Sequence, residues 1–98
     1  MSEARRDDPV LAGLIAVIEQ WRKAIREERV TARRIVELSD NHSEFREALL
    51  VVAGEGGKVS TGRLGKWLGK VKGRRVNGKH IEEAGSRDGI ALWQVTAS

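Results

Sequence analysis

The spacing of the apolar residues changes at Gly73. Before Gly73, apolar side chains recur every three or four positions, as they do from Val10 to Ile25, and this spacing is typical of amphipathic helices. After Gly73 the spacing approaches two, which is typical of strands. Asn77-Gly78 is a strong signal for a two-residue hairpin turn, because both residues tolerate positive φ. The 98 residues therefore predict one domain that is mainly α with a small C-terminal β-hairpin.

Helix boundaries follow from capping and helix-breaking residues. Polar side chains that can cap a helix N-terminus precede each apolar stripe, namely Asp8 with Pro9 next, Thr31, Ser43, and Ser60 or Thr61. Glycines from Gly54 to Gly57 end the third helix, and Gly73 ends the fourth. The sequence predicts helices near 9–28, 31–39, 44–54 and 61–72. The apolar stripe of the first helix either packs on the core or forms a dimer or docking surface.

The residues beyond Gly73 predict the hairpin. Residues 74–76 suggest a short strand, and residues 79–84 and 90–95 suggest two paired strands. A loop over residues 85–89 would carry Arg87 at its tip. We expect Trp67 and Trp93 to share a core with Leu49, Leu64 and Leu68. Helices followed by a hairpin describe a winged helix-turn-helix, here a single winged-helix-like domain over residues 9–96 after a flexible tail over residues 1–8.

Charge is distributed unevenly along the chain. Residues 1–54 hold nine Lys or Arg against ten Asp or Glu, a net of −1, whereas residues 55–98 hold nine against four, a net of +5. Between Lys58 and Lys79 there are eight basic residues and no acidic one. A basic patch of this kind attracts polyanions, most often nucleic acid, although a solvated surface is the plainer alternative.

The predicted helix 61–72 has three faces. Leu64, Trp67, Leu68 and Val71 form the apolar face, and Arg63, Lys66 and Lys70 form a basic stripe beside it. A third stripe contains Gly62, Gly65 and Gly69, at a cost of about 0.8–1 kcal/mol each relative to alanine. This bare stripe could let the backbone approach phosphates, or another helix could pack on it, or the helix ends could fray.

In a winged helix, one helix enters the major groove and the hairpin loop contacts the backbone or the minor groove. The predicted partner is duplex DNA, bound mainly through its phosphate backbone with weak or no sequence specificity. The candidate nucleic-acid-binding residues are Ser60, Thr61, Arg63, Lys66, Lys70, Lys72, Arg74, Arg75, Lys79 and Arg87.

Other functions find little support. Gly54 to Lys58 lacks the spacing of a phosphate-binding loop, because Val52 stands at the required first glycine and Val59 at the magnesium-binding Ser or Thr. The chain has two histidines and no cysteine, so we expect no metal, no cofactor and no enzymatic activity. No apolar run approaches the roughly 18 residues of a membrane span. We expect a cytoplasmic protein, and its oligomeric state stays open.

Four segments together carry a resemblance to a known family. They are residues 45–50 (FREALL), 63–68 (RLGKWL), 73–78 (GRRVNG) and 89–93 (GIALW). This combination resembles the C-terminal segment of phage- and plasmid-type primase/helicase or replication ATPase proteins, over residues 30–96. The resemblance implies a winged-helix-like module that serves replication of a mobile genetic element, and it leaves open that the rest of a longer replication protein is a partner. It implies no ATPase or primase activity here, because no nucleotide-binding motif is present.

Two functions therefore fit the sequence. The first is a DNA-binding winged-helix module. The second is a protein-interaction module of a replication or regulatory complex that has the same fold and uses the first helix for docking.

Overall fold

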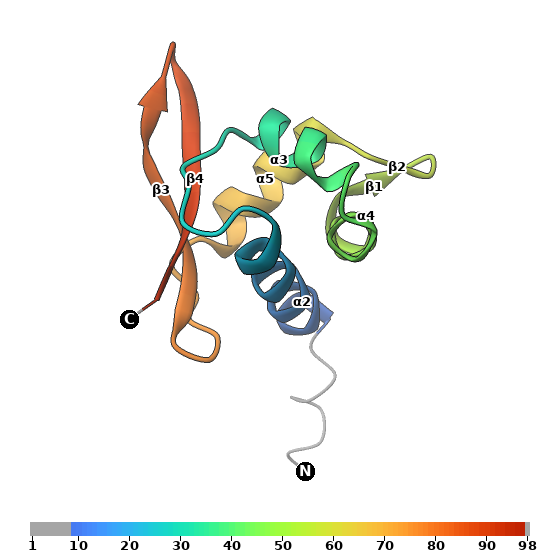
Figure 1. Ribbon diagram of the computed structural model, residues 1–98, viewed down its shortest axis with the longest axis horizontal. Helices are drawn as coiled ribbons and strands as arrows, with labels where there is room; N and C mark the ends of the chain where they lie inside the picture. The colour runs from blue at the N-terminus through green and yellow to red at the C-terminus, as the bar shows by residue number, and fades with distance from the viewer. Residues whose placement is uncertain (1–8, 98) are drawn as a thin grey trace.

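The computed structural model describes residues 9–97, so the expected flexible tail lies outside the described residues. Within this range, four helices lead to a C-terminal antiparallel hairpin (Figure 1). The helices are α2 (Pro9–Ala24), α3 (Ala32–Ser39), α4 (Ser43–Ala53) and α5 (Thr61–Val71), and the strands are β1 (Gly54–Glu55), β2 (Lys58–Val59), β3 (Lys79–Arg87) and β4 (Ile90–Ala97). The predicted order of four helices followed by a C-terminal hairpin is confirmed, and β1 and β2 between α4 and α5 were not predicted. The structure is nevertheless a mixed one, because β3 and β4 span nine and eight residues, more than the predicted small hairpin.

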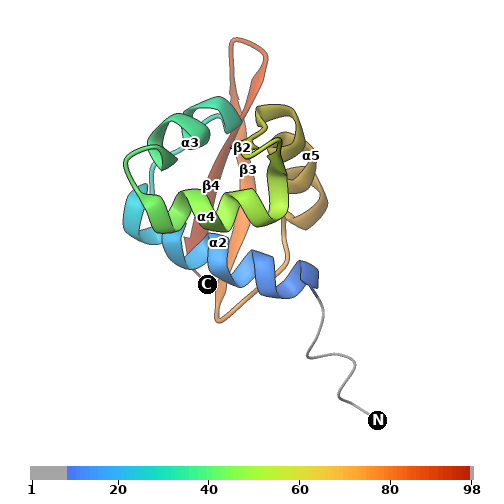
Figure 2. The same cartoon turned by 90° about the vertical axis from the view of Figure 1, so that its right-hand side faces the viewer.

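Helix α2 packs along α4 (Figure 2). Leu14, Ile18 and Trp21 of its predicted stripe are buried, and the ring centroid of Trp21 lies 6.3 Å from that of Phe45. The helix ends at Ala24 and not near residue 28, because Arg26 adopts φ 67° and the N–H groups of Ile25 and Arg26 both donate to the Trp21 carbonyl. No glycine marks this left-handed cap, so the sequence could not show it.

One glycine of α2 allows the close approach to α4. A Cβ atom on Gly13 would lie 2.7 Å from Cγ1 of Val52, which is closer than packed atoms tolerate. A larger side chain would therefore push the two helices apart.

The caps of the next two helices follow the prediction in one case only. Thr31 caps α3, because its Oγ1 accepts a hydrogen bond from the N–H of Arg34 at 3.1 Å. Ser43 does not cap α4, since it is already the first helical residue and His42 occupies the N-cap without a side-chain hydrogen bond. The last turn of α3 runs on through backbone hydrogen bonds to His42, and this leaves no extended residue at Ser43.

A short hairpin connects α4 to α5. The glycines expected only to end the third helix form the turn between β1 and β2, with Gly56 at φ 60° and Gly57 at φ 83°. The Ser60 N–H then donates to the Ala53 carbonyl at 2.8 Å. The hairpin thus returns the chain to the end of α4 and sets the start of α5.

The turn at Asn77-Gly78 forms as predicted, with φ 53° and 77°. The predicted strand over residues 74–76 is wrong except at Val76, which forms a single bridge to Lys79 across this turn. The N–H of Gly73 donates to the Ile81 carbonyl at 2.8 Å, so the chain leaves α5 directly against β3.

The β3–β4 hairpin is longer than predicted. The loop expected over residues 85–89 is wrong, because a bulge between Glu83 and Ser86 lets pairing resume and continue to Arg87. The reversal is confined to Asp88 and Gly89, at φ 54° and 78°, and these two positive values are those of a type I′ hairpin turn. Asp88-Gly89 is itself a signal for this turn, but Gly85 and Ser86 before it suggested a wider loop.

The hairpin joins the helices through one shared core. Val30 and Trp93 exchange two backbone hydrogen bonds of 2.9 and 2.7 Å, which tie the segment before α3 to β4. Trp67 and Trp93 are 9% and 6% exposed. Both belong to one cluster with the leucines predicted to accompany them, Leu49, Leu64 and Leu68.

Candidate nucleic-acid interface

Helix α5 presents a basic surface because its apolar face is fixed against the core. Leu64, Trp67, Leu68 and Val71 are buried, and Arg63, Lys66 and Lys70 are exposed. We call these three exposed residues the α5 basic stripe. The predicted faces of this helix are confirmed, since the 3.6-residue period decides which side chains leave the core together.

The glycine stripe of α5 is open. A Cβ atom added to Gly65 or Gly69 would meet no heavy atom within 4 Å, and one added to Gly62 would meet only Ser60 Oγ at 3.9 Å. The alternative that another helix packs on these glycines is therefore wrong for the described residues. Because the stripe is unobstructed, a ligand can approach the α5 backbone more closely here than over any helix with larger side chains.

Two of the predicted contacts are held in ion pairs. Arg63 Nε lies 3.4 Å from Glu55 Oε1, and Lys72 Nζ lies 3.4 Å from Glu83 Oε1. All four side chains are between 44% and 62% exposed. Exposed pairs of this kind contribute about 0.2–1 kcal/mol, so a polyanion can replace the carboxylate in either pair.

The other cations have no acidic partner within residues 9–97. They are Lys66, Lys70, Arg74, Arg75, Lys79 and Arg87. All but the half-buried Lys79 are exposed. Unpaired exposed cations attract anions without first breaking a protein contact.

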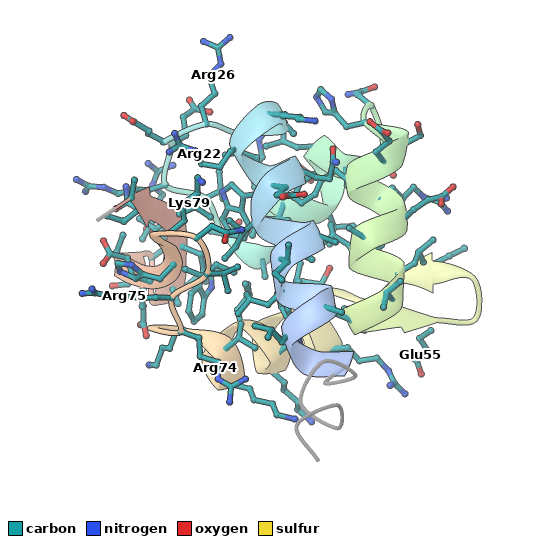
Figure 3. The ribbon with its side chains drawn as sticks, turned by 90° about the horizontal axis from the view of Figure 1, so that it is seen from below. Arg22, Arg26, Glu55, Arg74, Arg75 and Lys79 are labelled. Carbon is teal, nitrogen blue, oxygen red and sulfur yellow. The ribbon has the colours of Figure 1, made fainter. Side chains whose placement is uncertain are left out.

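Arg74, Arg75 and Lys79 surround the turn that follows α5, and we call them the turn cluster. Figure 3 shows that Arg22 and Arg26 of the α2 end continue the same side of the molecule, whereas Glu55 lies on the opposite side. Arg22 lines a shallow hollow with Ala97, and Ala97 is the register partner of Lys79. The sequence pattern did not predict Arg22 and Arg26, because both belong to the half of the chain with balanced charge.

Arg87 lies apart from the other predicted residues. It is the last residue of β3, paired with Ile90, and not the loop tip. It lines an open groove of about 440 Å³ together with Arg29, Arg33 and Arg34. The structure therefore places Arg87 beside α3 and not beside the α5 basic stripe.

Ser60 and Thr61 stand at the start of α5. Ser60 is half-buried, and its Oγ accepts a hydrogen bond from the N–H of Arg63 at 3.2 Å. This serine is therefore occupied as the helix cap. Thr61 is exposed and free to face a ligand.

Other kinds of site find no support among the described residues. In residues 9–97, no group of three or more His, Cys, Asp or Glu side chains could hold a metal ion. No helix in that range is both long and apolar enough to cross a membrane.

No protein-family model, curated protein or solved structure matches this chain. The residues and their geometry are therefore the basis for inferring its function.

Proposed function

We propose that this chain is a winged-helix-like DNA-binding module, with α5 as the helix that faces the duplex and the β3–β4 hairpin as the wing. The observation that carries the proposal is the surface of α5. Lys66 and Lys70, which have no acidic partner in residues 9–97, stand beside a glycine stripe that no other part of these residues covers. Cations next to accessible backbone suit a phosphate backbone, which is a dense row of negative charge.

The turn cluster extends this surface beyond the C-terminal end of α5. Arg74 and Arg75 are exposed, and Lys79 begins the strand that follows. A duplex that lies on α5 would meet these side chains as it continues past the helix. Phosphate contacts position a protein on DNA but carry no sequence information, so the proposed binding is weakly specific or non-specific.

The association with replication of a phage or plasmid is part of the same proposal. It is supported by the four sequence segments that resemble replication proteins, all of which lie on α4, α5, the turn cluster or β4. We propose a binding role without catalysis, and the rest of a longer replication protein remains a proposed partner.

The alternative of a protein-interaction module required the apolar stripe of the first helix to be exposed for docking. Leu14, Ile18 and Trp21 of α2 and Ile25 just after it are 0–3% exposed, because α4 and the hairpin cover them. A partner could not dock on this apolar stripe without unfolding the core.

A salt titration tests the proposal. With about four to five phosphates neutralised, the logarithm of the binding constant for random duplex should fall against the logarithm of salt concentration with a slope of about −4. Lys66→Ala should flatten this slope by about one and weaken binding to all sequences about equally. The matched control is Lys23→Ala, an exposed lysine on α2 that lines a hollow beside the start of α4.

Two outcomes of the salt titration would contradict the proposal. Absence of binding to any nucleic acid at low salt would exclude the function. Binding that does not respond to salt would exclude the phosphate-contact mechanism even if DNA were bound.

A further inference from the structure

Four arginines from two distant parts of the chain line one groove. Arg29 precedes α3, Arg33 and Arg34 lie in its first turn, and Arg87 ends β3. We call this the arginine groove. We propose that it binds the phosphate backbone of a single nucleic-acid strand, separate from the duplex on α5. This inference rests on the proposed function.

The charge of the arginine groove is only partly neutralised. Its lining includes two carboxylates, Glu28 and Glu37, against the four guanidinium groups. Glu37 is shared, since it lies 3.6 Å from Arg33 Nε and 3.3 Å from Arg34 Nη1. These two arginine side chains are 84% and 58% exposed, so the shared pair is weak.

The other two arginines of the groove make no ion pair within the described residues. Arg29 and Arg87 have no acidic partner in residues 9–97. A guanidinium group offers five donors in a planar fork that matches two phosphate oxygens. Four such groups around one open groove therefore fit a run of phosphates better than an isolated anion.

The arginine groove borders the start of α3 and the end of β3, whereas the α5 basic stripe belongs to a different helix. Figure 2 shows the tip between α3 and α5, where it projects beyond both helices. Because α3 and α5 pack on each other through their buried faces, their exposed residues point outward on different sides. A duplex bound on α5 would not occupy the arginine groove, so a different strand can bind there.

The hairpin tip itself carries an exposed apolar side chain. Ile90 is 57% exposed at the first position of β4, directly across from Arg87. Apolar side chains at such positions can insert at unstacked base steps. An apolar tip beside the arginine groove suits the junction where a single strand leaves a duplex.

The test compares forked DNA that has one single-stranded arm with duplex of the same sequence. We expect the fork to bind more tightly. Its salt dependence should also be steeper, by about 0.7 for each additional phosphate neutralised on the single strand. The double variant Arg33→Gln/Arg34→Gln should abolish this preference and leave the affinity for duplex within about twofold, because both residues lie off the α5 surface.

Lys66→Ala is the matched comparison, and it should weaken fork and duplex by the same factor. Arg87→Gln is a second groove variant outside α3, should the double variant unfold. Its expected result is the same loss of fork preference.

The outcomes separate the two proposals. Duplex binding without fork preference in the unaltered protein would overturn this inference alone, whereas absence of all binding would overturn the proposed function as well. A groove variant that weakens fork and duplex equally would also overturn the separate site. A groove variant that keeps the fork preference but no longer binds an Asp/Glu-rich peptide would also overturn this inference, because the groove would then bind a protein segment.

Discussion

Replacing glycines of the α5 glycine stripe by alanine should change stability and DNA binding in opposite directions. Gly65 and Gly69 lie inside a helix, and a Cβ atom at either position meets nothing within 4 Å. Replacing Gly by Ala in a helix interior stabilises the helix by about 0.8–1 kcal/mol. Such replacements at compatible sites in proteins raise the free energy of unfolding by about 0.4–1 kcal/mol. The double variant Gly65→Ala/Gly69→Ala should therefore raise the free energy of unfolding by about 1–2 kcal/mol.

The expected change is large enough to measure by thermal unfolding. For a domain of this size, 1 kcal/mol corresponds to about 4–8 °C in Tm. Gly13→Ala is the matched control, because its new Cβ would lie 2.7 Å from the Val52 side chain. Val52 is β-branched and stiff within a helix, so we expect no stabilisation from that variant.

Binding should respond in the other direction. If the bare stripe brings phosphates close to α5, two added methyl groups should remove about one phosphate contact. At about 0.1 M salt, one lost contact lowers the affinity for duplex about eightfold. Loss of stability in the double variant would refute the open stripe, and gain of stability with unchanged affinity would refute its role in close approach.

Three further predictions concern single side chains. Trp67→Ala should cost about 3–5 kcal/mol of unfolding free energy, because the ring is 9% exposed; urea titration measures this, and a cost below about 1 kcal/mol would contradict a core position. Ser60→Ala should cost about 1 kcal/mol, since its Oγ accepts from the N–H of Arg63, whereas Thr61→Ala should have little effect in the same assay. Glu55→Gln should release Arg63 from an ion pair that contributes about 0.2–1 kcal/mol, and this should raise the affinity for duplex by up to about fivefold. Fluorescence anisotropy measures the affinity, and a fall would show that Arg63 does not face the DNA.

Local patterns were sufficient for the features that depend on neighbouring residues. The order of helices and hairpin, the buried face of α5, the Thr31 cap and the Asn77-Gly78 turn all depend on residues a few positions apart. Such features are readable because 3.6-residue and two-residue periods and turn propensities are properties of short segments.

Two boundaries were wrong for different reasons. Arg26 adopts a left-handed conformation without glycine, and this ends α2 early. The bulge between Glu83 and Ser86 extends β3, because pairing with β4 outweighs the loop character of the intervening residues.

By itself, the sequence determined which face of α5 is buried and that residues 58–79 form a basic segment, since both are properties of neighbouring positions. Only the tertiary structure decided which charges meet. It packs Gly13 tightly and leaves Gly65 open, although both are helical glycines. It also brings Arg29, Arg33 and Arg34 to Arg87, although the first three belong to a half of the chain with a net charge of −1. Net charge counts residues along the chain, whereas the electrostatic field that a ligand meets depends on distances that only folding sets.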